Sequence, residues 1–175
     1  MMLDAFGERI CIMGPSGSGK STLAVAIGCA LALPVIHLDQ LHHQPRTNWR
    51  PRPAEEFAAL HDAAIQGPRW VMEGNYSRLL PQRLARATGL ILLDIPAPLS
   101  LYRYLRRCWF DSIRHGTLEG ADDRANWLMI RHILGASRAN RRRYRRMFDD
   151  LALPRLQLAS ARAIDGFYRD NGLAR

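Results

Sequence analysis

The chain of 175 residues has one lysine, three cysteines and no apolar run long enough to cross a membrane. Its cysteines, Cys11, Cys29 and Cys108, are far apart and odd in number, which excludes a disulfide framework and a clustered zinc site. We expect buried thiols in a cytoplasmic protein, because cytosolic thiols stay reduced. The longest apolar stretch, residues 23–36, is shorter than the roughly 20 residues of a membrane helix. Acidic residues near the N-terminus argue against a signal peptide.

Positive charge is concentrated in one segment. The chain carries 25 basic and 16 acidic side chains, for a formal net charge of +9. Residues 101–146 contain 12 arginines and four acidic residues, which is a local net charge of +8. The rest of the chain, with 13 basic and 12 acidic groups, is nearly neutral. Because 47% of the residues are hydrophobic, disorder is excluded and the basic segment needs a local explanation.

Short apolar runs alternate with helical patterns along the chain. The runs that we expect to be strands are residues 9–13, 35–38, 70–72, 89–94 and 156–159. The patterns between them, and after Ser160, predict helices. Uninterrupted apolar strands separated by helices are typical of a parallel sheet covered on both faces. The sequence therefore predicts a single α/β domain over residues 1–175, with a helical insert after the fourth strand.

A glycine-rich stretch lies between the first expected strand and the first expected helix. It matches the pattern G-x-x-x-x-G-K-[S/T], and its residues are Gly14, Pro15, Ser16, Gly17, Ser18, Gly19, Lys20, Ser21 and Thr22. Glycines allow the backbone to curl so that successive N–H groups point at phosphate oxygens, and the helix N-terminus adds its own free N–H groups. In such a loop the lysine reaches the β- and γ-phosphates and the serine binds Mg²⁺. The sequence therefore predicts binding of ATP and Mg²⁺.

Two large classes of nucleotide-binding protein are excluded by what the chain lacks. Switch GTPases read guanine with an N-K-x-D motif, which cannot exist here because Lys20 is the sole lysine. Transporter ATPases are longer and carry an LSGGQ-type signature, which is absent. Small kinases and their relatives remain.

Further residues extend the pattern over nearly the whole chain. They are residues 14–22, 38–39, 48–49, 70–76 and 93–96, with Arg103 and Arg107. Together they resemble the DNA topology modulation protein (FlaR-like) family, a branch of the adenylate-kinase-like P-loop proteins, and the segment Trp-x-x-Glu-Gly-Asn-Tyr is the most specific part. The resemblance implies a three-layer P-loop NTPase fold with a five-stranded parallel sheet. It also implies an adenylate-kinase-like helical lid insert at about residues 101–146.

Acidic residues follow three of the expected strands, at the edge where ligands lie in a doubly wound sheet. Asp39 comes after the second strand, Glu73 after the third and Asp94 after the fourth. By the resemblance, Asp39 would hold the acceptor hydroxyl as a base or orienter, Glu73 would orient the waters of Mg²⁺, and Asp94 would act as a Walker B acid at the metal. The alternatives stay open: a turn or cap for Asp39, a helix cap or salt bridge for Glu73, and an Asx turn for Asp94.

Substrate contacts are implied beside these acids. Adenylate kinases place an Asp-Gly pair, an aromatic residue and an arginine after the third strand, and this chain has Glu-Gly there, followed by Asn75 and Arg78. Gly74 would allow close approach of the acceptor, with Asn75 next to it, and Arg78 would meet an acceptor phosphate. Trp49 would stack on an acceptor ring or simply cover its own loop.

The arginine-rich segment resembles the lid of adenylate-kinase-like enzymes, in which two helical arms close arginines over ATP. Arg103 and Arg107 match the family pattern. Arg138, Arg142 and Arg145 are further candidates for the lid, because their spacing places them on one face of the later expected helix. One arginine that neutralises the transferred group can be worth roughly 10³–10⁵ in rate. A solvated basic face is the alternative for several of them, and nucleic-acid binding is another.

These observations predict an ATP·Mg²⁺-dependent phosphotransferase that moves the γ-phosphate of ATP to a small acceptor, with a nucleotide or nucleoside as the first choice. Its catalytic residues would be Lys20, Asp39, Glu73, Arg103 and Arg107. The competing hypothesis is an ATP-binding, DNA-associated regulator. A third is a non-nucleotide metabolite kinase, since gluconate and shikimate kinases share the loop and an Asp after the second strand. It ranks lower because no paired arginines are evident for a sugar-acid carboxylate.

Overall fold

The computed structural model describes residues 1–110 and 141–174. Within these ranges the strands are β1 (Arg9–Met13), β2 (Val35–His37), β3 (Trp70–Glu73), β4 (Gly89–Leu93) and β5 (Arg155–Leu158). The helices are η1 (Leu3–Phe6), α1 (Lys20–Leu31), α2 (Leu38–His42), α3 (Ala54–Ile65), α4 (Leu80–Arg86), α5 (Ala97–Phe110) and α7 (Ala161–Asp170), and residues 141–150 form a further helix. The five strands expected from the sequence are confirmed.

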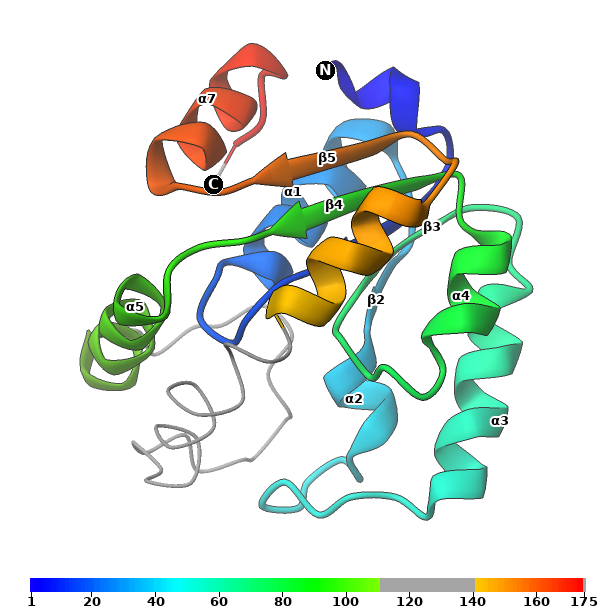
Figure 1. The fold of residues 1–175 in the computed structure, drawn as a ribbon. Coiled ribbons are helices and arrows are strands. Elements are labelled where there is room, and N and C mark those ends of the chain that lie inside the picture. The colour runs from blue at the N-terminus through cyan, green and yellow to red at the C-terminus, as the bar shows by residue number, and fades with distance from the viewer. Residues whose placement is uncertain (111–140, 175) are drawn as a thin grey trace.

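The five strands form one parallel sheet in the order β2-β3-β1-β4-β5, which confirms the expected α/β fold. β1 lies at the centre, with Ile12 opposite Glu73 of β3 and Met13 opposite Leu92 of β4. The loops that follow β3 and β4 therefore flank the loop that follows β1. Figure 1 shows the carboxyl ends of β4 and β5 pointing toward the side of the molecule where α5 lies.

Alternating side chains of the central strand contribute to a hydrophobic core on each face of the sheet. On one face, Ile10 and Ile12 pack with α1 and α7. On the other face, Cys11 and Met13 pack with α3, α4 and the helix of residues 141–150. Helices thus cover both faces, as uninterrupted apolar strands require. With the glycine-rich loop after β1, this is the three-layer arrangement of a P-loop NTPase.

Two details differ from the expectations. Cys29 is exposed, because it lies on the outer side of α1, whereas Cys11 is buried in β1. The start of the expected polar loop after β2 is helical, because Leu38 and Leu41 are three positions apart and both pack against the core. The side chain of Cys108 lies outside the described residues.

Most of the expected lid, about residues 101–146, lies outside the described residues. Its first arm is described in α5 as far as residue 110, and its last part is described from residue 141. Arg138 is outside these ranges, as is the side chain of Arg107. No helix of the described part is long and apolar enough to span a bilayer.

Candidate functional site

The glycine-rich loop joins β1 to α1 in a backbone conformation that favours glycine. Gly14, Gly17 and Gly19 have positive φ angles of 151°, 76° and 95°. Gly19 caps α1, and the N–H of Leu23 donates to the Gly19 carbonyl at 3.0 Å as the first bond of the helix. The N–H groups of residues 20–22 therefore have no helical acceptor, and they lie at the positive end of the helix dipole. This geometry suits an anion such as a phosphate.

Lys20 lies folded back over the loop. Its Nζ donates a hydrogen bond to the carbonyl of Pro15 at 3.0 Å, and the residue is half-buried. A phosphate oxygen offers a charge-assisted bond, which is stronger than the bond to this neutral carbonyl. The ammonium can therefore exchange the carbonyl for a phosphate.

α5 braces the loop from outside. The Ser100 hydroxyl donates to the carbonyl of Ser16, and Nη1 of Arg103 donates to the carbonyl of Ser18 at 3.3 Å. A side chain at Gly17 would come within 2.6 Å of the Ser100 carbonyl oxygen. The fold thus places Arg103 directly at the loop.

Glu73, the last residue of β3, joins the first turn of α1 to β2. Its Oε1 accepts hydrogen bonds from the Ser21 hydroxyl at 3.0 Å and from Nδ1 of His37 at 2.9 Å. Glu73 is 2% exposed, and burial alone would raise its pKa. The hydrogen bond from His37 and the charge of Lys20 outweigh burial and lower the pKa of Glu73 below its ordinary value, so it is ionised at neutral pH. A hydroxyl and a carboxylate side by side are the hard oxygen donors that Mg²⁺ and its waters prefer.

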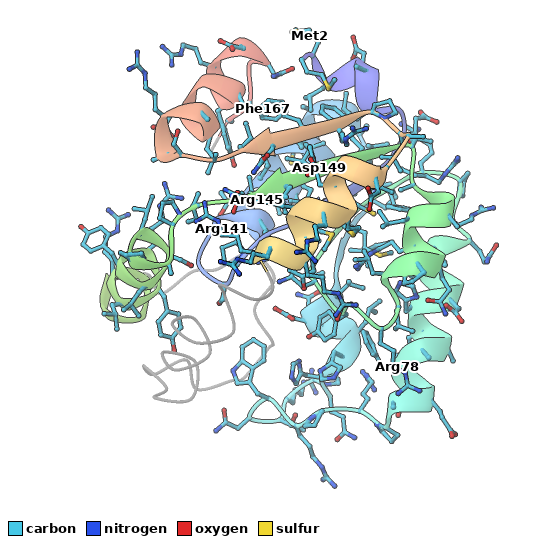
Figure 2. All side chains as sticks on the ribbon, viewed as in Figure 1. Met2, Arg78, Arg141, Arg145, Asp149 and Phe167 are labelled. Atoms are coloured by element: carbon cyan, nitrogen blue, oxygen red, sulfur yellow. The ribbon has the colours of Figure 1, made fainter. Side chains whose placement is uncertain are left out.

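Asp94, directly after β4, is surrounded by cations. Its carboxylate accepts from the guanidinium of Arg141, from Nε of Arg145 at 2.6 Å, and from Nε2 of Gln157 at 2.6 Å. Nη2 of Arg141 also donates to the Asp94 carbonyl at 3.0 Å. Figure 2 shows both arginines reaching from the helix of residues 141–150 toward the end of β4. The described structure therefore gives this carboxylate two arginine partners, where the sequence suggested a metal.

Asn75 ties the turn after β3 to the glycine-rich loop. Its Oδ1 accepts from the N–H of Gly14 at 3.2 Å, and its Nδ2 donates to the Gly14 carbonyl at 3.0 Å. The Asn75 carbonyl accepts from Nη2 of Arg83 in α4 at 2.8 Å. A side chain at Gly74, whose φ is 130°, would meet Cβ of Leu38 at 2.9 Å. Asn75 is therefore bonded to the loop itself, and Gly74 makes room for α2.

Asp39 lies in the first turn of α2 and is joined to the turn after β3. The Tyr76 hydroxyl donates to its Oδ1 at 2.6 Å. Burial and the charge of Asp39 raise the pKa of Tyr76 well above its ordinary value, so the hydroxyl stays a donor. Nδ1 of His43 lies 2.9 Å from the Asp39 carbonyl and must donate, since a carbonyl oxygen only accepts. Trp49 packs edge-on against His43, with ring centroids 5.2 Å apart.

Two of the expected residues lie apart from this network. Arg78 is exposed, and Figure 2 shows it well away from Arg141 and Arg145. Arg142 is exposed as well, although its neighbour Arg141 reaches Asp94.

Residues of the network that sequence reasoning did not identify include His37, Tyr76, Arg83, Ser100, Arg141 and Gln157. A signal exists for Arg83, which shares the buried side of α4 with Leu80, three positions earlier. A signal also exists for Arg141, which precedes Arg145 by four positions and so lies on the same helix face. Tyr76 ends the Trp-x-x-Glu-Gly-Asn-Tyr segment, although that segment does not predict its contact with Asp39. His37 has no such signal, because its partner Glu73 comes from another strand.

The fold and the glycine-rich loop together define the architecture of a P-loop NTPase. No protein-family model matches the chain, and no curated protein matches it significantly. Membership of the DNA topology modulation family therefore stays a prediction.

Several solved structures share this fold. A gluconokinase from Sinorhizobium meliloti 1021 aligns with a TM-score of 0.56 at 15% identity, over 95% of each chain. A shikimate kinase from Acinetobacter baumannii, in complex with shikimate, aligns with a TM-score of 0.52 at 15% identity, over 93% of this chain and 90% of that one. A shikimate kinase from Bacteroides thetaiotaomicron gives 0.52 at 18% identity, over 93% and 95%. At these identities the likeness establishes the fold alone.

Proposed function

We propose that the protein is an ATP-dependent phosphotransferase that moves the γ-phosphate of ATP to a hydroxyl group of a small molecule. The observation that supports this most is the convergence of three features at one edge of the sheet. A phosphate-type loop contacts Arg103, an oxygen pair of Ser21 and Glu73 lies beside it, and Asp94 gathers two further arginines. Phosphoryl transfer needs positioning and charge neutralisation, with little covalent chemistry from the protein.

The nucleotide would lie with its phosphates in the loop of residues 14–22. Backbone N–H groups and the Lys20 ammonium would bind the phosphate oxygens. Arg103 is 3.3 Å from a carbonyl of the same loop, so its guanidinium is within reach of those phosphates. The two cations would balance the negative charge that the transferred group carries.

The residues present also fit a magnesium ion. The Ser21 hydroxyl and the Glu73 carboxylate lie 3.0 Å apart, and the lowered pKa of Glu73 keeps that group ionised. Mg²⁺ prefers such oxygen donors together with waters and substrate phosphates. Ser21 would contact the ion and Glu73 its waters, and the bound ion would neutralise charge on the β- and γ-phosphates.

Asp39 is the base in this proposal. A bond forms between the acceptor oxygen and the γ-phosphorus, and the bond from that phosphorus to the β–γ bridging oxygen breaks, so ADP leaves with the electron pair. The proton of the acceptor hydroxyl passes to the Asp39 carboxylate, whose Oδ1 is held by Tyr76 at 2.6 Å. The Tyr76 hydroxyl fixes the orientation of this carboxylate, and a general base must be positioned within hydrogen-bond reach of the proton that it removes.

Two observations shift the expected acceptor toward a small hydroxylated metabolite. Arg78, the residue expected to bind the phosphate of a nucleotide acceptor, is exposed and lies well away from Arg141 and Arg145 (Figure 2). The structural neighbours are named as gluconokinase and shikimate kinase. We therefore place the non-nucleotide acceptor, ranked third from the sequence, level with nucleotides and nucleosides.

A coupled assay of ADP release tests the proposal. The protein is incubated with ATP and Mg²⁺ and with three panels of acceptors: nucleoside monophosphates, nucleosides, and sugars with their acids. We expect one panel to raise ADP release at least about tenfold over the basal rate, which corresponds to a barrier lowered by roughly 1.4 kcal/mol. Lys20→Ala should abolish the increase, and Arg169→Ala, on the exposed side of α7, should retain it. No stimulation by any acceptor, with an unchanged basal rate in Lys20→Ala, would refute the proposal.

A DNA-binding measurement on the same protein tests the competing hypothesis of a DNA-associated regulator. Exposed Arg142, Arg143 and Arg146 are the observation in its favour. It predicts binding of duplex DNA whose log affinity falls with log salt at a slope of about −0.9 for each neutralised phosphate. Such binding, together with ATP turnover that no acceptor stimulates, would replace the kinase proposal.

A further inference from the structure

Arg83 is a buried cation beneath the candidate site. It lies in α4, is 1% exposed, and donates from Nη2 to the Asn75 carbonyl at 2.8 Å. Its Nε and Nη1 are buried and have no hydrogen-bond partner among the described residues. Burial lowers the pKa of Arg83, although the guanidinium remains the charged form of an arginine at neutral pH. Burying a guanidinium with unused donors costs free energy, so packing alone does not explain its presence.

Asn75, which accepts this bond, is attached at its other end to the glycine-rich loop. Its side-chain amide pairs with both the N–H and the carbonyl of Gly14, at 3.2 and 3.0 Å. Gly14 is where the chain leaves β1 and turns into the loop, with a φ of 151°. A side chain there would lie 2.5 Å from the Leu93 carbonyl oxygen, so this turn is closely packed as well as hydrogen-bonded. The orientation of Gly14 therefore depends on that of Asn75.

We propose that Arg83 is a positioning residue for nucleotide binding, acting through Asn75 to fix the first peptide of the phosphate-binding loop. The path runs from the guanidinium to the Asn75 carbonyl, and from the Asn75 side chain to both backbone groups of Gly14. Arg83 supports the loop from its position in α4, and its side chain is buried from solvent. The inference rests on the proposed function only in taking ATP as the ligand of the loop.

A positioning role and a packing role give opposite results when Arg83 is replaced by methionine. Methionine fills a similar volume and removes the cost of the buried charge, so the thermal midpoint of Arg83→Met should stay level or rise. The loop would lose its anchor, and we expect the affinity for MgATP to fall at least about tenfold, which corresponds to RT ln 10. A residue that only packs would lower stability and leave affinity unchanged.

Calorimetric titration of MgATP into the full chain, without any acceptor, provides the measurement. Arg83→Lys keeps a donor for the Asn75 carbonyl and should bind within a few-fold of wild type. Arg86→Met, an exposed arginine of the same helix, is the matched control and should bind like wild type. Asn75→Leu should lower the affinity for MgATP as much as Arg83→Met does. The double variant should bind MgATP no more weakly than the single variant of lower affinity, because both substitutions interrupt the same path of hydrogen bonds.

The outcomes separate this inference from the function it rests on. Arg83→Met that is folded and binds MgATP like Arg86→Met would overturn the inference and leave the kinase proposal standing. Additive losses in the double variant would also overturn it, since they indicate independent effects. A wild-type chain that binds no MgATP would overturn both. If Arg83→Met does not fold, Asn75→Leu with unchanged affinity would overturn the inference in its place.

Discussion

Glu73 and Asp94 each stand at the end of a strand beside β1, yet their partners differ in charge. Glu73 accepts from a hydroxyl and an imidazole, whereas Asp94 accepts from two guanidinium groups and an amide. Both residues are 2% exposed. The single negative charge of Asp94 is already paired with two guanidinium groups, so little of it is left for a metal ion. We infer that Glu73 helps to hold the magnesium ion and that Asp94 positions Arg141 and Arg145.

Amide substitutions at these two positions separate the roles. Asp94→Asn keeps the shape and removes the charge that holds Arg141 and Arg145, so the KM for ATP should rise about tenfold, or roughly 1.4 kcal/mol. The Mg²⁺ concentration for half-maximal rate should stay the same in Asp94→Asn and rise in Glu73→Gln. Steady-state titrations with ATP and with Mg²⁺ measure both quantities. A higher Mg²⁺ requirement in Asp94→Asn would return Asp94 to the metal role.

At the scale of single residues, the sequence predicts a role best where neighbouring residues form a local motif. The roles of Lys20 and Ser21 could be predicted because the loop motif is local and its flanking strand and helix are recognisable in the sequence. Arg141 shares a helix face with Arg145, but its contact with Asp94 was not predicted, because Asp94 is 47 positions away along the chain. Asn75 was expected at the acceptor, but its side chain pairs with Gly14, 61 positions away. Contacts of such separation follow from strand order, which no local pattern encodes.

At the scale of elements, the glycine-rich loop and α5 are fitted to one another. The hydroxyl of Ser100 donates to the loop at Ser16, and Gly17 leaves room for the Ser100 backbone. Apolar runs predicted the strands well, because a buried parallel strand reads as a continuous hydrophobic segment. The short helix α2 was missed because five residues give too little periodicity to recognise.

Two alanine substitutions at glycines should therefore act in opposite directions. Gly17 has a φ of 76°, and its added methyl would meet the Ser100 carbonyl oxygen at 2.6 Å. Gly17→Ala should lower the free energy of unfolding by about 1–2 kcal/mol and weaken MgATP binding. Gly166 lies within α7 and has nothing within 4 Å of an added methyl, so Gly166→Ala should raise it by about 0.5–1 kcal/mol. Denaturant melts and ATP titrations check both, and a stabilised Gly17→Ala would contradict the packing of α5 on the loop.

At the scale of the whole molecule, a buried and a half-buried histidine make stability depend on pH. His61 is 0% exposed, its Nε2 has no hydrogen-bond partner among the described residues, and burial lowers its pKa despite its hydrogen bond to Asp62. Burial, and then the charge of His43, likewise lower the pKa of His42. The unfolded chain therefore takes up protons at these positions before the folded one does. Their contribution to stability is present above about pH 6.5 and is lost as the pH falls through the lowered values.

We accordingly expect the thermal midpoint to fall between pH 7 and pH 5. Glu73 adds no dependence in that window, because its pKa is lowered and its carboxylate stays ionised in the folded chain. His61→Leu should flatten the decline, whatever its effect on the midpoint at pH 7. Melts at half-unit steps of pH give the slope for both proteins. Equal slopes would show that His61 is not among the groups responsible.

The strand order also gives the glycine-rich loop two unlike flanks. Toward β3 stands the ionised Glu73, and toward β4 stands Asp94 with its charge cancelled by arginines. The electrostatic potential therefore becomes more positive from one flank to the other, across a distance of about two strand spacings, or roughly 10 Å. A triphosphate in the loop would be attracted toward the more positive β4 flank, and the ionised Glu73 on the β3 flank would help to hold a magnesium ion. Under the proposed function, an acceptor would approach from the β2 side, where Asp39 lies, because β2 is the neighbour of β3 on the side away from β1.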